Sequence, residues 1–141
     1  MRRRGASRVV TQVEIEIPSR SVYVGVVRLA LASLARSAGL SEESVDDLKI
    51  AAGEACANAV IVNEESAPDV PLKIHWAHEG DHVVVEVEGA GHPFDSAESD
   101  NGDDHAARMR MSVALLESLV DSCEVTEGPD GAMTARLTVN L

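Results

Sequence analysis

Apolar and polar residues alternate in several segments of the chain, which is the period of a β-strand with one buried face. The first such segment covers residues 9–17. Residues 70–88 continue the alternation on both sides of a turn at 79–81, which indicates a hairpin. Residues 122–126 and 132–141 indicate a second hairpin near the end of the chain.

Apolar residues recur at helical spacing in three other segments. In residues 22–34 this spacing continues up to Gly39, a residue type that often ends a helix. Ser19 or Ser21 is the expected cap at the start of this helix.

The second predicted helix follows Ser41, a capping residue, and runs to about Asn63. The third covers about residues 109–120. Residues 89–107 between strand and helix are rich in Gly, Pro, Ser, Asn and acidic residues, and this composition predicts a mobile loop or lid, mainly over residues 92–107.

This order of elements predicts the fold class. A strand, two helices, a hairpin, a loop, a helix and a closing hairpin fit a two-layer α/β sandwich with its helices on one face of a sheet. Antiparallel hairpins argue against a doubly wound parallel sheet. The length of 141 residues fits a single domain, expected over residues 9–141 after a flexible tail at 1–8.

Composition and charge narrow the function. The chain has 24 acidic and 12 basic residues, a net charge of -12, which argues against direct binding of nucleic acid or anionic membranes. A protein partner with a basic surface is the better hypothesis. We find no apolar run of roughly 20 residues, so we expect a cytoplasmic protein. Cys56 and Cys123 have no metal-site or redox spacing and are expected to be reduced core thiols.

Two polar residues stand out in the second predicted helix. Glu54 and Asn58 lie one turn apart among small apolar residues, so they share one environment. A carboxylate and an amide placed there need solvent, a hydrogen-bond network or a ligand. The spacing alone favours a simple hydrogen bond between the two. The alternative is a phosphoryl-transfer site, with Asn58 as a magnesium ligand and Glu54 positioning water or the attacking hydroxyl.

The stretch Asp46-Asp-Leu-Lys-Ile-Ala-Ala-Gly-Glu-Ala-Cys-Ala-Asn-Ala-Val60 resembles the N-box helix of the GHKL superfamily, in the form found in anti-sigma factor serine kinases. The similarity covers most of the chain, in the family's order. It implies a Bergerat sandwich, with a mixed, mostly antiparallel sheet covered on one face by three helices. It also implies that Asn58 binds magnesium at the ATP phosphates and that Glu54 is the catalytic acid–base residue. Arg28 matches a partner-contact position, although a solvated arginine is the simpler interpretation.

Two other family motifs are altered. The adenine motif Asp-x-Gly-x-Gly corresponds to Val87-Glu-Gly-Ala-Gly91, so Gly89 and Gly91 match its glycines while a valine replaces the acid that reads the base. Glu88 should point to the opposite sheet face unless the strand bulges.

The second glycine motif corresponds to Arg108-Met-Arg-Met-Ser112. Arg108 and Arg110 could attract phosphate, but they cannot replace closely approaching backbone amides. Acidic residues just before this stretch add repulsion. We therefore expect Mg-ATP binding to be weakened or lost.

Three functions remain open after this comparison. The first is an anti-sigma-factor-like regulator that acts by partner switching, binding a sigma factor or a STAS-type anti-anti-sigma antagonist through surfaces around Arg28 and the lid. The second is an active ATP-dependent kinase that phosphorylates a serine of the antagonist. The third is a self-associating domain, with a homodimer formed through the exposed first strand.

Overall fold

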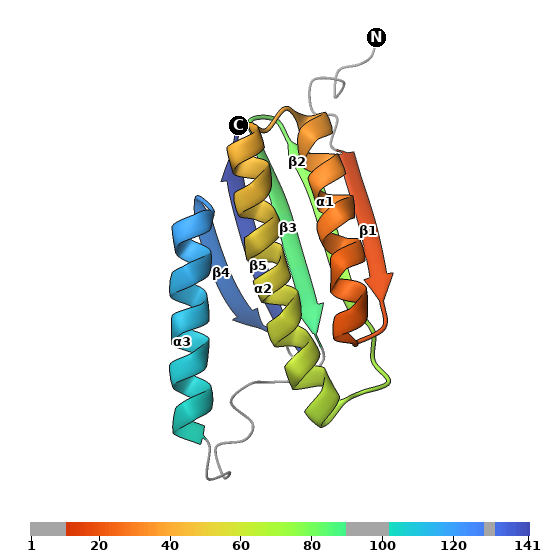
Figure 1. Ribbon diagram of the computed structural model, residues 1–141, viewed down its shortest axis with the longest axis vertical. Coiled ribbons are helices and arrows are strands. Elements are labelled where there is room, and N and C mark those ends of the chain that lie inside the picture. The colour runs from red at the N-terminus through yellow and green to blue at the C-terminus, as the bar shows by residue number, and fades with distance from the viewer. Residues whose placement is uncertain (1–10, 90–101, 129–131) are drawn as a thin grey trace.

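A computed structural model describes residues 11–89, 102–128 and 132–141 of the chain. Figure 1 shows a two-layer sandwich in which three helices lie side by side on one face of a five-stranded sheet. The predicted fold class is therefore confirmed. The predicted tail at residues 1–8, Gly91, and most of the predicted lid and of the last hairpin's turn lie outside the described residues.

The elements follow the predicted order. They are β1 (Thr11–Ile17), the short 3-10 helix η2 (Ser21–Tyr23), α1 (Val24–Ala38), α2 (Glu42–Ser66), β2 (Leu72–Glu79), β3 (His82–Gly89), α3 (Gly102–Leu119), β4 (Ser122–Glu127) and β5 (Met133–Asn140).

The strand order is β1-β2-β3-β5-β4, and every neighbouring pair is antiparallel. Both predicted hairpins are present, as β2–β3 and β4–β5. Because β5 lies between β3 and β4, the chain passes from the centre of the sheet through α3 to the edge and then returns. This path puts α3 beside α2, which occupies the middle of the helical layer (Figure 1).

Helix ends follow the predictions in part. Gly39 ends α1 with a φ of 98°, in the left-handed region that suits glycine. Ser41 caps α2 by accepting a 3.1 Å hydrogen bond from the backbone nitrogen of Ser44. The predicted capping of the first helix by Ser19 or Ser21 is wrong, because neither η2 nor α1 has a side-chain cap.

Ser19 instead belongs to a buried polar cluster. Its hydroxyl donates to the carbonyl of Val70 and accepts a 2.9 Å hydrogen bond from the amide of Asn63. Asn63 also donates to the carbonyl of Val70 at 3.1 Å. These bonds tie the chain before η2 and the chain before β2 to the end of α2, so Ser19 serves tertiary structure in place of a helix cap.

The first helical region is apolar on two sides. Residues Ser21–Ala38 are long and apolar enough, by length and composition, to cross a membrane, which corrects the sequence prediction that no such stretch exists. The inner side, with Val27, Leu31 and Ala35 fully buried, packs in the core of the domain. On the outer side Val22, Val26 and Leu29 keep 74%, 55% and 71% of their surface exposed.

The last helix differs most from its prediction. It begins at Gly102 and not near residue 109, so residues 102–107 are helical although they were expected within the lid loop. Polar residues in this segment obscured the helical pattern in the sequence.

The core is aliphatic, as the composition requires. In the part of the chain that the structure describes, Trp76 is the one aromatic residue among the largest fully buried side chains. On α2 the small residues Ala51, Ala52 and Ala55 are buried, which allows α1, α3 and β3 to approach this helix closely. The central position of α2 therefore brings its polar residues next to both neighbouring helices.

Candidate functional site

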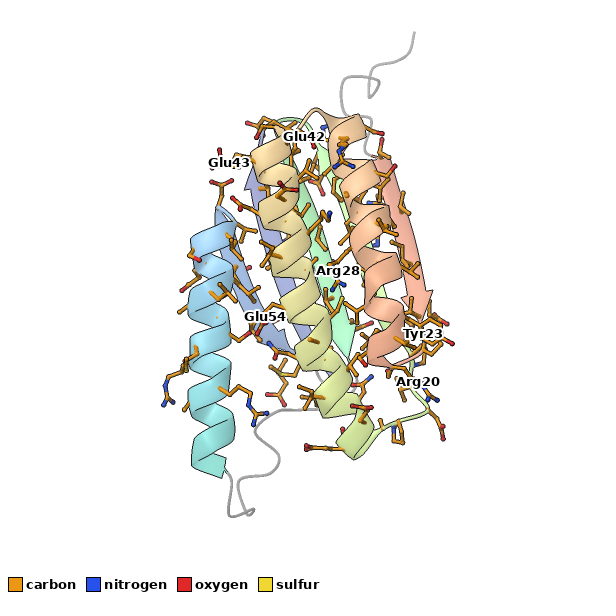
Figure 2. All side chains as sticks on the ribbon, viewed as in Figure 1. Arg20, Tyr23, Arg28, Glu42, Glu43 and Glu54 are labelled. Carbon is orange, nitrogen blue, oxygen red and sulfur yellow. The ribbon has the colours of Figure 1, made fainter. Side chains whose placement is uncertain are left out.

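Glu54 and Asn58 of α2 meet a serine of α3. The hydroxyl of Ser112 donates a 2.8 Å hydrogen bond to Oε2 of Glu54, and Nδ2 of Asn58 donates a 2.5 Å hydrogen bond to the same hydroxyl. Ser112 is buried, with 4% of its surface exposed, whereas Glu54 and Asn58 are half-buried. Figure 2 shows Glu54 in the space between α2 and α3. We call these two hydrogen bonds the Ser112 bridge.

The Ser112 bridge settles how the two polar residues are satisfied. Of the arrangements considered from the sequence, a hydrogen-bond network is the one present, and it reaches across two helices where the spacing alone favoured a direct bond. Sequence reasoning missed Ser112 as a site residue. Ser112 precedes the buried Leu116 by four residues and the buried Val120, which directly follows α3, by eight. This spacing was the available signal, since it places all three on one side of the helical turn.

A small pocket opens beside the bridge, between α2, α3 and the sheet. Its volume is about 50 Å³, enough for a few water molecules. The lining is mainly apolar, with Asn58, Asn63 and Ser112 as its polar members; the other residues are Ala55, Ala59, Val62, Val87, Gly89, Val113, Leu116, Val125, Met133 and Ala135.

The residue expected to replace the base-reading acid lies in this pocket. Val87 is buried and faces the helices. Glu88 is exposed on the other face of the sheet. It pairs in regular register with Lys73 on β2 and with Thr134 on β5. The strand has no bulge at this point, so the predicted orientation of Glu88 is confirmed and the pocket holds no acid from β3.

Gly89 has a packing reason to be glycine. A Cβ at this position would lie 3.1 Å from Oδ1 of Asn63 and 3.3 Å from the Cβ of Ala59, both on α2. The close approach of β3 and α2 therefore accounts for this glycine without any ligand.

Arg108 and Arg110 lie within α3, not at its start. Both side chains are exposed. Because α3 begins at Gly102, the backbone N–H groups of residues 108–112 lie inside the helix and bond to its preceding turn. They cannot form an open cradle for phosphate groups.

Mg-ATP does not fit the site in this arrangement. Oε2 of Glu54 and Nδ2 of Asn58 already bond to Ser112, although Oδ1 of Asn58, the atom that could bind a metal ion, takes no part in these bonds. The described lining of the pocket also lacks a base-reading acid, and residues 108–112 supply no open backbone amides because they lie inside α3. Among the described residues there is no group of three or more His, Cys, Asp or Glu that could hold a metal ion.

Arg28 lies on the other side of α2 from the bridge. Its exposed side chain crosses Gly53, where a Cβ would come 3.1 Å from Nη1, and Figure 2 shows it between α1 and α2. In the described part of the chain the guanidinium has no hydrogen-bond or ion-pair partner. The structure therefore separates Arg28 from Glu54 and Asn58. Arg28 lies on the side of α2 that faces α1, and the other two residues lie on the side that faces α3.

The two cysteines are free, as expected. Burial raises the pKa of Cys56 from its ordinary value of 9.0 to about 12, although the charge of Arg28 opposes this shift. Burial and then the charge of Glu117 raise the pKa of the half-buried Cys123. Neither thiol is therefore activated as a nucleophile at neutral pH.

The fold agrees with the results of comparison. Residues 17–138 match the family described as the histidine kinase-like ATPase domain, and the chain belongs to this family. Its similarity is to the serine-protein kinase RsbW branch. The chain is 32% identical to RsbW of Bacillus velezensis over 139 residues, which are 91% of this chain and 87% of that protein. It is 31% identical to RsbW of Bacillus subtilis, over 89% of this chain and 85% of that protein.

Two solved structures share the fold. The RsbU and RsbW domains of Rv1364c from Mycobacterium tuberculosis match with a TM-score of 0.72 and 23% identity, over 93% of this chain and 32% of that one. The SiaB–SiaC complex from Pseudomonas aeruginosa matches with a TM-score of 0.64 and 12% identity, over 90% of this chain and 88% of that one. The predicted family and fold are thus confirmed.

Proposed function

We propose that the protein is an anti-sigma-factor-like regulator that works by partner switching, and that its binding of ATP is weakened or lost. It binds a sigma factor, a STAS-type anti-anti-sigma antagonist, or each in turn. It acts in the cytoplasm, where these partners regulate transcription. The observation that carries the proposal is the Ser112 bridge, which engages the two polar residues of the family's kinase site within the protein itself.

The exposed side of the first helical region supports a role in binding proteins. Val22, Val26 and Leu29 form an apolar stripe there, with Tyr23 also 40% exposed. A surface of this kind is typical of a protein interface.

Charge narrows the partner segment that this stripe would accept. Between residues 20 and 38 the charged residues are Arg20, Arg28 and Arg36, and there is no acidic residue. In a chain of net charge -12 this is a locally basic stretch, in which Arg36 is paired with Glu42 at 3.0 Å. The net charge favours a partner that is basic elsewhere, but the segment that contacts α1 should be acidic and apolar.

The nucleotide part of the proposal is tested by titration calorimetry of the wild-type protein with Mg-ATP. We expect a Kd weaker than about 1 mM, because the pocket lacks the base-reading acid and the bridge occupies the polar pair. Binding in the micromolar range would contradict the proposal.

The partner part is tested with substitutions on α1. The wild-type protein is used to isolate its sigma factor or antagonist from the native cell, and the identified protein is then titrated against variants. Val26→Asp should abolish binding because it places a charge in the apolar stripe, and Arg28→Glu should weaken it. Ser33→Asp, at an exposed position of the same helix, is the matched control. If Ser33→Asp loses as much affinity for the partner as Val26→Asp, the loss is only an effect of the added charge. If Val26→Asp binds the partner with full affinity, the apolar stripe is not the binding surface.

An active kinase is the second candidate function. The carboxylate of Glu54 favours it, because it accepts a hydrogen bond from a serine hydroxyl within the protein, and a general base makes the same kind of contact with an attacking serine. A kinase assay with radiolabelled ATP and the identified antagonist separates the two candidates, with Asn58→Ala as the blank. Phosphate transfer above this blank would establish the kinase.

Self-association is compatible with either function. β1 forms one edge of the sheet and pairs with β2 on its other side, so its outer edge offers backbone groups for pairing with a second copy. Light scattering over a range of concentrations tests for this homodimer, and a monomer at the highest concentration would exclude it.

A further inference from the structure

Two hydrogen bonds between α2 and α3 meet at one hydroxyl, that of Ser112. Ser112 comes from a segment more than 50 residues away in the sequence, yet it is 4% exposed and lies directly between Glu54 and Asn58. The two polar residues are therefore satisfied by a fixed internal partner and do not require a ligand.

A hydroxyl is suited to this position for a chemical reason. The carboxylate of Glu54 accepts hydrogen bonds, whereas the Nδ2 of Asn58 donates them. A serine hydroxyl donates its proton to the first and accepts from the second, so one small side chain satisfies both. Alanine or glycine at residue 112 would leave the carboxylate and the amide without this partner.

A magnesium ion would bind Oδ1 of Asn58, which the bridge leaves free, but a phosphate oxygen would need Nδ2 of Asn58 and an attacking hydroxyl would need Glu54. Both would have to displace the Ser112 hydroxyl, and α3 holds this residue at the bridge because Leu116 and Val120 are buried in the core. The bridge therefore opposes ligand binding in two ways, by occupying the polar pair and by fixing α3 against α2.

We infer that Ser112 is the specificity-determining residue that closes this site, acting as a built-in substitute for the ligand of Glu54 and Asn58. The inference rests on the proposed loss of nucleotide binding and assigns a cause to it. It also implies that α3 holds its position beside α2 without nucleotide, so a partner meets the same α3 surface whether or not ATP is present.

Substitutions at residue 112 test the inference in the full chain. Ser112→Ala removes the hydroxyl, Ser112→Gly removes the whole side chain, and Ser112→Thr keeps the hydroxyl. Ser118→Ala and Ala114→Gly are matched controls, since both residues are exposed on the same helix. Circular dichroism first establishes that each variant retains its helices.

The first measurement is calorimetric titration with Mg-ATP. Ser112→Gly and Ser112→Ala should bind at least about tenfold more tightly than the wild type, and Ser112→Thr and both controls should not. The second is hydrogen exchange of the α3 amides, which should become faster in Ser112→Ala than in Ser118→Ala.

Each outcome bears on the inference separately from the proposed function. If neither Ser112→Ala nor Ser112→Gly binds Mg-ATP more tightly than its control, the inference is wrong, and faster exchange alone would show a purely structural bridge. If the wild type binds ATP at micromolar concentration, the proposed function fails. The role of Ser112 is then still decided by the ratio of variant to wild-type affinity.

Discussion

The side chain of Arg28 lies across Gly53, and this contact joins α1 to α2. A Cβ at residue 53 would come 3.1 Å from Nη1 and 3.2 Å from Cδ of Arg28. Such contacts are tight, so the arginine must shift if residue 53 becomes larger. The glycine therefore helps to determine where the guanidinium lies.

This relationship predicts how Gly53→Ala changes stability. Alanine in place of a helical glycine should raise the free energy of unfolding by about 0.5–1 kcal/mol, because it favours the helix. The gain should be smaller with Arg28 present than in an Arg28→Ala background, where nothing has to move. Urea unfolding of the four proteins measures the coupling, and equal gains in both backgrounds would show that Arg28 does not press on residue 53.

Gly89→Ala should lower the free energy of unfolding by about 1–3 kcal/mol, because the added Cβ would overpack the contact between β3 and α2. The Cβ would lie 3.1 Å from Oδ1 of Asn63. The same change should cost less in an Asn63→Ala background, which removes that oxygen. A nucleotide role alone for Gly89 predicts no loss of stability, so an unchanged unfolding midpoint in urea would contradict the packing explanation.

Ser41→Ala should lower the free energy of unfolding by about 1 kcal/mol, because it removes the acceptor for the backbone nitrogen of Ser44 at the start of α2. Ser37→Ala is the control, as an exposed serine within α1. Thermal or urea unfolding compares the two, and a similar effect of both changes would mean that the cap contributes little.

The two cysteines should differ in reactivity. Burial raises the pKa of Cys56 to about 12, so its thiol stays protonated and enclosed at pH 8. A thiol reagent such as DTNB should therefore modify Cys123 first and Cys56 only as the protein unfolds. In a Cys123→Ser variant no thiol of the folded protein should react quickly, and rapid modification of that variant would show that Cys56 is accessible.

The same shift predicts a loss of stability at high pH. The pKa of Cys56 is higher in the folded state than its ordinary value of 9.0, so the folded protein holds this proton more tightly. The contribution is complete below pH 9.0 and is lost as the pH rises toward about 12. Stability between these values should fall less steeply in Cys56→Ala than in the wild type.

Most of the fold could be predicted from the sequence because its elements are strongly periodic. The strands alternate, and Gly39 and Ser41 mark helix ends by local chemistry that does not depend on the rest of the chain. Ser19 could not be assigned in this way. Its partner Asn63 is distant in the sequence, and the tertiary hydrogen bond replaced the local cap that a serine before a helix suggests.

The site was predicted in part. Glu54 and Asn58 stood out because they are polar residues within an apolar helix. The prediction that they share one environment is confirmed, since both bond to the hydroxyl of Ser112. What the sequence could not indicate is the partner that satisfies them. Ser112 reaches them only because the sheet order β1-β2-β3-β5-β4 places α3 beside α2.

The regular register of β3 limits how an acid could be brought into the pocket. An acid is already present one residue after Val87, but alternate side chains of a strand emerge on opposite faces, so no rotation of Glu88 about its own bonds reaches the pocket. Sliding the strand by one residue would turn its buried valines toward solvent. Residue 87 faces the pocket and residue 88 faces away from it, so an acid can enter the pocket from this part of β3 only by substitution of Val87 itself.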